Sequence, residues 1–395
     1  MSTFDVVTIG GGLAASAVAI SLAKHGIKVL VLERETEFRD RVRGEALTPW
    51  GVAEAKELGI DGVLLKSCAR EIPWVEMGFG PRNLLETTPQ KAPFLTFCHP
   101  EMQQALLSEA ERSGSQVRRG VTVHSIESIG TKLTVTTTNG KTERIPARLV
   151  IGADGRGSAV RRWCGFVSQK DPQPFQFSGV LLSGASLPDG TAFFVFHPDL
   201  GRVIGVVPET RGRCRAYLGY PSASNLALQG PNKLSTFICE SSRVFPQLAE
   251  AYANAKSIGP LASFDVSPNW VDHPYCDGVA LLGDAAATSD PSFGRGLATT
   301  LRDARVLRDA LLANSDWDIA GHQYANRHDE YFHAILKVCG WLRSVFQDPG
   351  PQAQALRQRA MPRIEEDPTR VPDHLFAGPD LPADQTVLSR FFGEC

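Results

Sequence analysis

The sequence lacks the cysteine patterns that bind metals or cross-link small secreted domains. Its eight cysteines are scattered over 395 residues. None forms a Cys-x-x-Cys pair, and no Cys/His cluster has the spacing of a zinc site. We therefore expect no metal centre, and we expect free thiols in the reducing interior of a cytoplasm.

Long apolar runs are also missing. No stretch reaches the length of a membrane-spanning helix, so we expect no integral membrane association. The N-terminus has no basic segment, and Gly10–Gly12 interrupts its apolar stretch, which predicts a buried strand rather than a signal peptide. We expect a cytoplasmic protein whose mature chain starts at or near Met1.

Neither sign of charge is in excess. The chain has 41 Lys and Arg against 43 Asp and Glu, a net charge of −2, and no basic block that could neutralise a run of phosphates. We therefore expect no nucleic-acid partner. Apolar residues make up 43% of the chain, which is enough for a packed core in two or three domains.

The chain does contain a βαβ pattern at its beginning. The pattern predicts a buried parallel strand at Val6–Ile9, a tight turn at Gly10–Gly12, a helix at Ala14–His25 and a second strand at Lys28–Leu32. Glu33 follows that second strand, about 20 residues after the turn.

The residues of this turn favour a dinucleotide ligand. Gly10 allows a sharp turn, Gly12 lets the backbone approach a pyrophosphate, and Ala15 stands where a third glycine would give close helix packing. The helix that begins at Ala14 directs free N–H groups toward the phosphates, and Glu33 can bond a ribose hydroxyl. The alternative is the glycine turn of an ordinary α/β protein. The stretch alone allows FAD as readily as NAD.

A second strand-to-loop stretch lies before the middle of the chain. The strand Arg148–Gly152 ends in Ala-Asp154-Gly155, and an Arg-bearing helix comes next. This pattern predicts a strand that returns to the nucleotide sheet near the phosphates, with a plain strand-to-helix turn as the alternative.

A third stretch has the same form. The strand Val279–Leu282 ends at Gly283 and Asp284, and the loop Pro291–Gly296 leads into a long helix. The loop and the start of the helix form a second anion site. Asp284, at the end of a strand, is placed to accept a hydrogen bond from a ribose or ribityl hydroxyl.

The charged stretch after the second strand contains Arg43-Gly44-Glu45. These residues either present an arginine to a ligand and a carboxylate to a sugar hydroxyl, or form a surface salt bridge.

Residues 169–275 alternate as strands and predict a β-rich layer with a substrate-binding face. The expected strands are Phe175–Leu182, Ala192–His197, Val203–Val207 and Arg215–Gly219, with one helical stretch at Lys233–Ala255. Side chains on these strands that could line a pocket are Phe194, Phe196, His197, Arg202 and Tyr217, and for Phe194 and Phe196 a place in the core is the preferred alternative.

The three stretches, in this order, resemble the FAD-dependent aromatic hydroxylases, the class A flavoprotein monooxygenases typified by p-hydroxybenzoate hydroxylase. Gly10-x-Gly12-x-x-Ala15 with Glu33-Arg34 is similar to the ADP-binding fingerprint of this family. Asp154-Gly155 is similar to its DG motif, and Gly283-Asp284 with the Pro291 loop to its GD motif. The resemblance spans roughly residues 1–315.

The resemblance implies an α/β fold with a Rossmann-like FAD-binding domain of the glutathione-reductase type. This domain would comprise 1–65, 98–168 and 276–315, with an inserted β-rich substrate domain at 66–97 and 169–275 and a helical C-terminal region at 316–395. The FAD-binding residues that it implies are Gly10, Gly12, Ala14, Ala15, Glu33, Arg34, Arg43, His99, Gln103, Val123, Asp154, Gly155, Gly283, Asp284, Pro291, Gly294, Gly296 and Leu297.

The resemblance also implies a reaction. The family binds FAD tightly without a covalent bond, takes electrons from a transiently bound NAD(P)H and oxygenates a substrate with O₂ through a flavin C4a-hydroperoxide. The loop of Pro291, Gly294, Arg295 and Gly296 would lie beside the flavin ring, where Arg295 and the start of the helix would stabilise negative charge on the reduced ring. No catalytic side chain is assigned.

We expect the substrate to be an electron-rich, aromatic or polyketide-like small molecule of aromatic degradation or bacterial secondary metabolism. The protein would be a monomer or a homodimer. Three alternatives remain: a flavin-dependent reductase of isoprenoid double bonds, a flavin-dependent halogenase and a non-catalytic FAD-binding redox sensor. The halogenase is disfavoured because the sequence has no Trp-x-Trp-x-Ile-Pro stretch.

Two features depart from the family pattern. Gly294-Arg295-Gly296-Leu297-Ala298 stands where many hydroxylases have Gly-x-Gly-x-Asn, so a side-chain contact common near the flavin is absent. The stretch beyond Asp316 does not resemble a thioredoxin-like domain.

Overall fold

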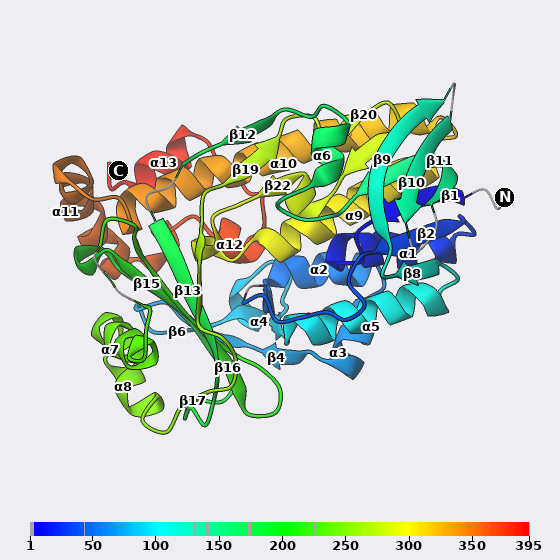
Figure 1. Cartoon of the computed structure of the whole chain (residues 1–395). Helices are drawn as coiled ribbons and strands as arrows, with labels where there is room; N and C mark the ends of the chain where they lie inside the picture. The colour runs from blue at the N-terminus through cyan, green and yellow to red at the C-terminus, as the bar shows by residue number, and fades with distance from the viewer. Residues whose placement is uncertain are drawn as a thin grey trace.

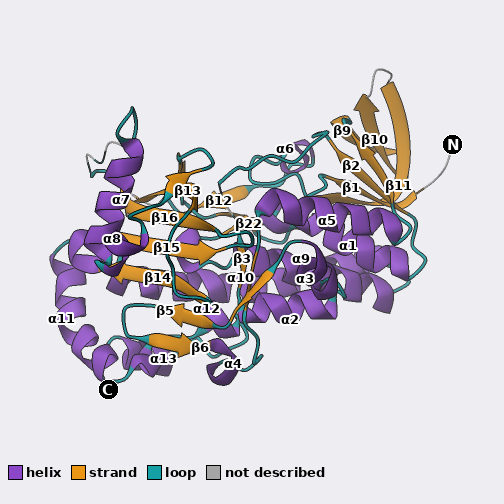
Figure 2. Cartoon of the chain, turned by 90° about the horizontal axis from the view of Figure 1, so that it is seen from below, coloured by secondary structure: helices purple, strands orange, loops and turns teal. Residues whose placement is uncertain are grey.

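The computed structural model describes residues 4–42, 44–129, 132–138, 142–172, 175–224, 226 and 228–394. It has a mixed α/β fold, which confirms the expected fold class. Two large sheets lie toward opposite ends of the molecule, with helices packed between and along them (Figures 1 and 2). The division into three regions remains a prediction.

The first large sheet is built around the N-terminal strand. β1 pairs in parallel with β2 and β11, which in turn pair in parallel with β8 and β21. Both faces are covered, which explains the unbroken apolar runs of these strands. The strands of this sheet are β1 (Phe4–Ile9), β2 (Val29–Glu33), β8 (Gln116–Arg119), β9 (Thr122–Ile129), β10 (Lys132–Thr138), β11 (Thr142–Gly152), β20 (Tyr275–Cys276) and β21 (Val279–Leu281).

Helices from distant parts of the chain pack together against one face of the first sheet. They are α1 (Leu13–Lys24), α2 (Pro49–Glu57), α3 (Asp61–Ser67), α5 (His99–Arg112) and α9 (Gly296–Ala313). Core residues of α1, among them Val18 and Ile20, are fully buried, because the helix lies between the sheet and its helical neighbours.

The second large sheet is mainly antiparallel, with the order β17-β13-β16-β15-β14-β5-β6 and β18 beside β13. Its strands are β5 (Trp74–Glu76), β6 (Pro81–Asn83), β13 (Phe175–Ser183), β14 (Thr191–His197), β15 (Arg202–Pro208), β16 (Arg213–Pro221), β17 (Lys256–Ser257) and β18 (Ala262–Asp265). The segment before α5 therefore adds two edge strands to the sheet that residues 175–265 form.

One face of the second sheet is covered by α7 (Lys233–Val244) and α8 (Gln247–Ala251). The sequence predicted a single helical stretch at Lys233–Ala255, and this was wrong. Phe245, before Pro246, has extended backbone angles (φ −140°, ψ 98°), because proline disfavours a helical conformation in the preceding residue.

The remaining elements are short, except for one long helix. The short strands are β3 (Ala46–Leu47), β4 (Arg70–Ile72), β7 (Phe94–Thr96), β12 (Ser168–Lys170), β19 (Asn269–Val271) and β22 (Ala287–Thr288). The helices are α4 (Leu84–Thr87), α6 (Ala159–Trp163), α10 (Trp317–Phe346), α11 (Pro351–Glu366), α12 (His374–Ala377) and α13 (Gln385–Phe391), and the 3₁₀ turns are Pro198–Leu200, Gly283–Ala285, Pro291–Phe293 and Pro368–Arg370.

Helix α10 connects the two large sheets. Its 30 residues are about 45 Å long at the usual helical rise. Tyr324 donates a hydrogen bond to the carbonyl of Leu281 in the first sheet, at 2.6 Å. Near the other end of the helix, the ring of Phe346 lies 5.3 Å from that of Phe196 in the second sheet.

Within the described parts of the chain, no helix is long and apolar enough to cross a membrane, and no group of three His, Cys, Asp or Glu residues could hold a metal ion.

A buried carboxylate joins α2 to α9, and its loss should destabilise the fold. Glu54 is 5% exposed and forms ion pairs with Arg302 and Arg305. We expect Glu54→Gln to lower the free energy of unfolding by about 3 kcal/mol, because two guanidinium groups lose their buried partner. The exposed ion pair of Glu330 with Arg327 provides the control. Glu330→Gln should change the free energy of unfolding by less than about 0.5 kcal/mol. Equal effects of the two variants in urea denaturation of the FAD-saturated protein would contradict this reading.

Candidate functional site

A cleft of about 480 Å³ opens where the parallel strands of the first sheet end. Most of the residues predicted from the sequence to bind a dinucleotide line it. They are Gly10, Gly12, Ala14, Glu33, Arg34, His99, Gln103, Val123, Asp154, Gly155, Gly283, Asp284 and Leu297. The structure therefore brings the three marked stretches of the sequence together in one place.

Five predicted residues do not line this cleft. Ala15, in the first turn of α1, is fully buried, as a packing position should be. Pro291, Gly294 and Gly296 line a second cavity beside the cleft. Arg43 lies outside the described residues.

The first turn brings two segments into close contact at Gly10. Gly10 has φ +103°, and a Cβ there would collide with the carbonyl of Ala153, so the position requires glycine. Gly12, before α1, makes no side-chain cap, and the first N–H groups of the helix remain available for an anion. These features fit the pyrophosphate of a dinucleotide.

Glu33 supports this turn directly. Its carboxylate accepts hydrogen bonds from the N–H of Gly11 at 2.6 Å and of Glu35 at 2.7 Å. The side chain thus holds the turn in shape while it lines the cleft. Asp154 has a comparable role just after β11. Its carboxylate accepts hydrogen bonds from Ser158 Oγ and the N–H of Ala159, both at 2.6 Å.

Sequence reasoning missed the residue that holds the third stretch. Asp303 of α9 accepts a hydrogen bond from the N–H of Gly283 at 2.8 Å and another from the hydroxyl of Tyr331 on α10. Burial raises the pKa of Asp303, while His328 and the two hydrogen bonds lower it. No short-range pattern marks this residue, because its partners are 20 and 28 positions away.

The second cavity has a volume of about 240 Å³ and adjoins the cleft. Four residues line both: His99, Arg156, Asp284 and Leu297. One side is the loop that leads into α9, and another is the face of β13, β15 and β16. Its aromatic lining consists of Phe94, Phe177, Phe194, Tyr217 and Phe264.

The expected pocket residues of the second sheet divide into two groups. Phe194 and Tyr217 line the cavity. Phe196 belongs to the core instead, since it stacks on Phe293 at 5.7 Å. His197 and Arg202 are not among the lining residues. The core prediction is thus confirmed for Phe196, and Phe194 packs against a buried cluster while it also lines the cavity.

Arg295 lines the second cavity together with the rest of this loop. Its side chain has no exposed surface, and Nη1 donates to the carbonyl of Ile335 and the thiol of Cys339 on α10, at 3.3 and 3.1 Å. Nε and Nη2 have no hydrogen-bond partner among the described residues. The N-terminus of α9, at Gly296, is a second positive group of this loop.

Glu45 is buried at the edge of the cavity, so the proposed surface salt bridge is wrong. It is 3% exposed, lies 3.3 Å from Arg215 and accepts a hydrogen bond from the hydroxyl of Tyr217. Burial raises the pKa of Glu45 to about 7, although Arg215 and Tyr217 lower it. Burial also raises the pKa of nearby Glu209 to about 7, against the opposing effect of Arg215 and Arg213.

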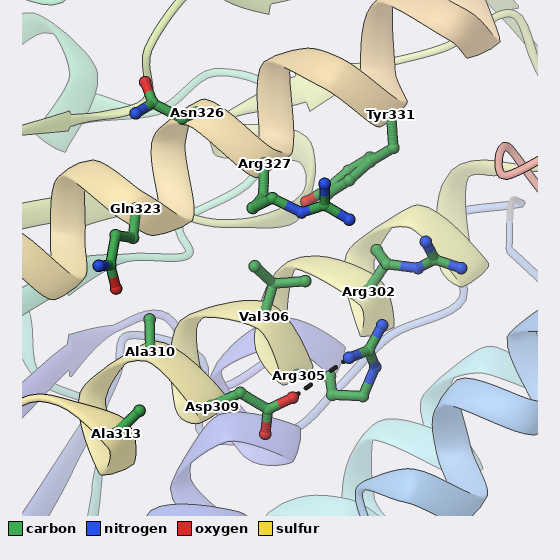
Figure 3. Close-up of a pocket in the computed structure, with 10 residues that line it drawn as sticks. All are labelled: Arg302, Arg305, Val306, Asp309, Ala310, Ala313, Gln323, Asn326, Arg327 and Tyr331. Carbon is green, nitrogen blue, oxygen red and sulfur yellow. Dashed lines mark hydrogen bonds and ion pairs between the residues drawn. The ribbon is translucent and has the colours of Figure 1, made fainter.

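Another hollow, between α9 and α10, lies on a different side of α9 (Figure 3). Arg302, Arg305 and Arg327 contribute to its lining. Each is already paired: Arg302 and Arg305 with Glu54, and Arg327 with Glu330. These arginines therefore do not form a ready anion site.

The comparison with protein families decides the cofactor. A family model described as an FAD binding domain matches residues 3–338, which is most of the chain. The chain belongs to this family of FAD-binding proteins. The glycine turn of the cleft and the free start of α1 fit that cofactor.

Curated relatives of this flavoprotein include oxygenases with different substrates. Squalene epoxidase 2 of Arabidopsis thaliana is 28% identical over 319 residues, which cover 78% of this chain and 54% of the relative, about half its length. Rifampicin monooxygenase of Streptomyces venezuelae is 26% identical over 364 residues, which cover 89% of this chain and 73% of the relative.

Solved structures share the fold of this flavoprotein. The p-nitrophenol 4-monooxygenase PnpA of Pseudomonas putida superimposes with a TM-score of 0.76 and 21% identity. The match covers 95% of this chain and 97% of PnpA. At this identity the likeness concerns the fold alone.

Removal of the carboxylate that holds Gly283 should weaken FAD binding. We expect Asp303→Asn to raise the dissociation constant of FAD about tenfold, since a buried hydrogen bond to a charged group is worth about 1.5–3 kcal/mol and part of it positions the loop. Asp309→Asn, on the same helix but away from Gly283, is the matched control. Flavin fluorescence titration measures the FAD affinity of both variants. An unchanged affinity in Asp303→Asn would show that the hydrogen bond from Gly283 to Asp303 does not support FAD binding.

Stability should fall as the pH rises from 4.5 to about 7. The raised pKa values of Glu45 and Glu209 mean that the folded protein keeps protons that the unfolded chain releases in this window. Glu209→Gln should reduce this fall by roughly 1–3 kcal/mol, and Glu330→Gln should leave it unchanged. Urea denaturation at pH 5 and pH 7.5 measures the difference. The same fall in wild type and Glu209→Gln would refute the assignment.

Proposed function

We propose that this protein is a monooxygenase that hydroxylates a small electron-rich arene with NAD(P)H and O₂. One observation carries the proposal. An aromatic cavity of about 240 Å³ adjoins the FAD cleft at the loop that begins α9. A substrate in that cavity would lie beside the flavin ring, away from bulk water.

The residues of the cleft suggest a part for each segment of FAD. The turn at Gly10 and Gly12 and the start of α1 would bind the pyrophosphate, and Glu33 the adenosine ribose. Asp284 would hold the ribityl chain, and Pro291, Gly294 and Gly296 would lie against the ring. His99 and Gln103, at the beginning of α5, line the same cleft and would contact the cofactor.

The N-terminus of α9 would stabilise negative charge on the reduced flavin. Its free N–H groups and the positive end of its dipole do this without a side chain. Arg295 lines the cavity at the same loop, with Nη1 of its buried guanidinium bonded to α10, and would add a second positive charge there. When bound, FAD supplies the activation of O₂, and the protein supplies orientation and exclusion of water.

The cavity favours a substrate of modest size. Its volume lies below the usual range of about 300–1,000 Å³ for ligand pockets, which suits a single ring better than a long chain. Epoxidation of an alkene is the second candidate, because squalene epoxidase 2 is among the relatives and much of the lining is apolar.

The test measures oxidation of NAD(P)H, uptake of O₂ and product mass for the FAD-loaded protein over a panel of arenes and alkenes. We expect arenes to raise the rates of NAD(P)H oxidation and of O₂ uptake. The product should be heavier than the arene by one oxygen atom. A gain of two hydrogens would identify a reductase, and incorporation of an added halide a halogenase. No stimulation by any compound would contradict monooxygenation.

A variant that fills the cavity provides an internal control. Gly205 lies on β15, and a Cβ there would come 3.6 Å from the ring of Phe194, so it would point toward the aromatic lining. We expect Gly205→Val to raise KM at least tenfold with unchanged FAD content, since the added methyl groups occupy substrate space. Wild-type kinetics in this variant would place the substrate elsewhere.

A further inference from the structure

The C-terminal region contributes one side chain to the second cavity. Leu375, in the short helix α12, lines this cavity and is 7% exposed. Among the described residues of the lining, it alone follows α9 in the sequence. Its Cδ1 lies beside the loop that begins α9, because a Cβ at Gly294 would be 3.7 Å from it. Leu375 is therefore part of the cavity wall next to the loop proposed to face the flavin ring.

The segment 373–380, which contains α12, is held at both ends by ion pairs. Asp373 accepts hydrogen bonds from Nη1 and Nη2 of Arg82 in β6, at 2.7 and 2.9 Å. Asp380 accepts hydrogen bonds from Nη1 and Nη2 of Arg302 in α9, at 2.9 and 2.8 Å. Bidentate pairs of a guanidinium and a carboxylate fix geometry as well as charge. These pairs therefore fix the position of the segment.

Between the two ion pairs, side chains from other parts of the chain bind the backbone of the segment. Trp50 of α2 donates a hydrogen bond from Nε1 to the carbonyl of Leu375, at 3.2 Å. Gln90 donates to the carbonyl of Ala377, at 2.8 Å. Gly378 has φ +98°, and a Cβ there would lie 3.2 Å from Cγ of Trp50, so the backbone passes close to the indole. Side chains, rather than pairing in a sheet, thus hold the segment in place.

Apolar contacts determine where the side chain of Leu375 lies. It packs in a buried cluster with Phe94 and Phe376, and Phe194 packs against the same cluster. Phe94 and Phe194 also line the cavity, with their ring centres 5.7 Å apart. Leu375 therefore belongs to the apolar wall that a bound ring would contact. Loss of carbon atoms at this position would enlarge a cavity of only about 240 Å³.

We propose that Leu375 sets the size of the substrate that the cavity admits, and that the ion pairs of Asp373 and Asp380 hold it in that position. This deepens the proposed function, on which it rests, by naming a residue that determines specificity. A smaller side chain at 375 leaves room for a substituent on the substrate ring, whereas a larger one takes room that an unsubstituted ring needs. A residue that only supported the fold would not give these two opposite effects.

A series of 4-alkylphenols, from phenol to 4-hexylphenol, provides probes of increasing length. Each is titrated into the FAD-loaded protein at pH 7.5, and the visible absorbance of the oxidised flavin reports binding. Leu375→Ala removes three carbon atoms, and each CH₂ that a ligand buries strengthens binding about fourfold. We expect Leu375→Ala to raise the affinity of 4-propylphenol relative to phenol at least tenfold over wild type. Leu375→Phe should weaken the binding of phenol at least tenfold.

Leu388→Ala is the matched control for the side chain. Leu388 is partly buried in α13, in the same C-terminal region, and does not line the cavity. The relative affinity of the two phenols should stay at its wild-type value in this variant.

Asp380→Asn tests the ion pair that holds one end of the segment. Its weakening lets Leu375 move aside, so the affinity of 4-propylphenol relative to phenol should rise about threefold. Asp367→Asn is the control, because Asp367 pairs with Arg390 in the same region without contributing to segment 373–380. It should leave the relative affinity unchanged.

The proposal is overturned if folded, FAD-loaded Leu375→Ala keeps the wild-type relative affinity, or if Leu375→Phe binds phenol as tightly as wild type does. Weaker binding of every probe in both variants also overturns it, as does a series of which no member perturbs the flavin of wild type. The carboxylate of Asp380 is 65% exposed, so Asp380→Asn should fold even where the Leu375 variants do not. An unchanged relative affinity in Asp380→Asn would then decide against the proposal.

Binding to the oxidised flavoprotein is independent of turnover, which separates this inference from the proposed function. Oxygenation of the probes with an unshifted size limit in Leu375→Ala would refute this inference alone. A shifted size limit without any oxygenation would refute the proposed function alone.

Discussion

The contact between the first turn and the end of β11 is the constraint on which the site depends. At Gly10 the backbone approaches the carbonyl of Ala153 so closely that no Cβ fits. This contact fixes the start of α1 beside Asp154, and the adjoining strand β21 brings Gly283 to the same edge. Strand ends from three distant parts of the chain thereby form one cleft.

Acidic residues in the cleft and buried behind it support the backbone of the turns that form the cleft. Glu33 bonds Gly11, Asp154 bonds Ala159, and Asp303 bonds Gly283. Each carboxylate thus holds a turn that must present N–H groups to a cofactor. Such prior ordering reduces the conformational entropy that FAD binding would otherwise cost.

Much of the FAD site could be predicted from the sequence, because its signals are local. A buried strand, a glycine turn and a helix follow one another within about 20 residues, and each has a recognisable pattern. The same local reasoning failed at Pro246, where one residue divides an apolar helical stretch. It also could not find what holds Arg295, since the partners of its Nη1 on α10 lie 40 and 44 positions away in the sequence.

The substrate cavity was beyond such reasoning for a physical reason. Glu45 and Tyr217 are 172 residues apart, and only the tertiary packing of the segment before β3 against the second sheet brings their side chains together. Period two placed Phe194 and Phe196 on one face of a strand, yet one meets the cavity and the other meets Phe293. A pattern within one strand gives no information about what covers each part of its face.

The buried charges beside the cavity are costly to the fold. Asp40 and Glu45 pair with Arg215, and Glu209 lies near both Arg215 and Arg213. Apolar residues of the same volume would be expected to serve the fold at least as well. Burial raises the pKa of Glu45 to about 7, and this side chain lines the cavity, so the cost of burying its charge falls at the site proposed for the substrate.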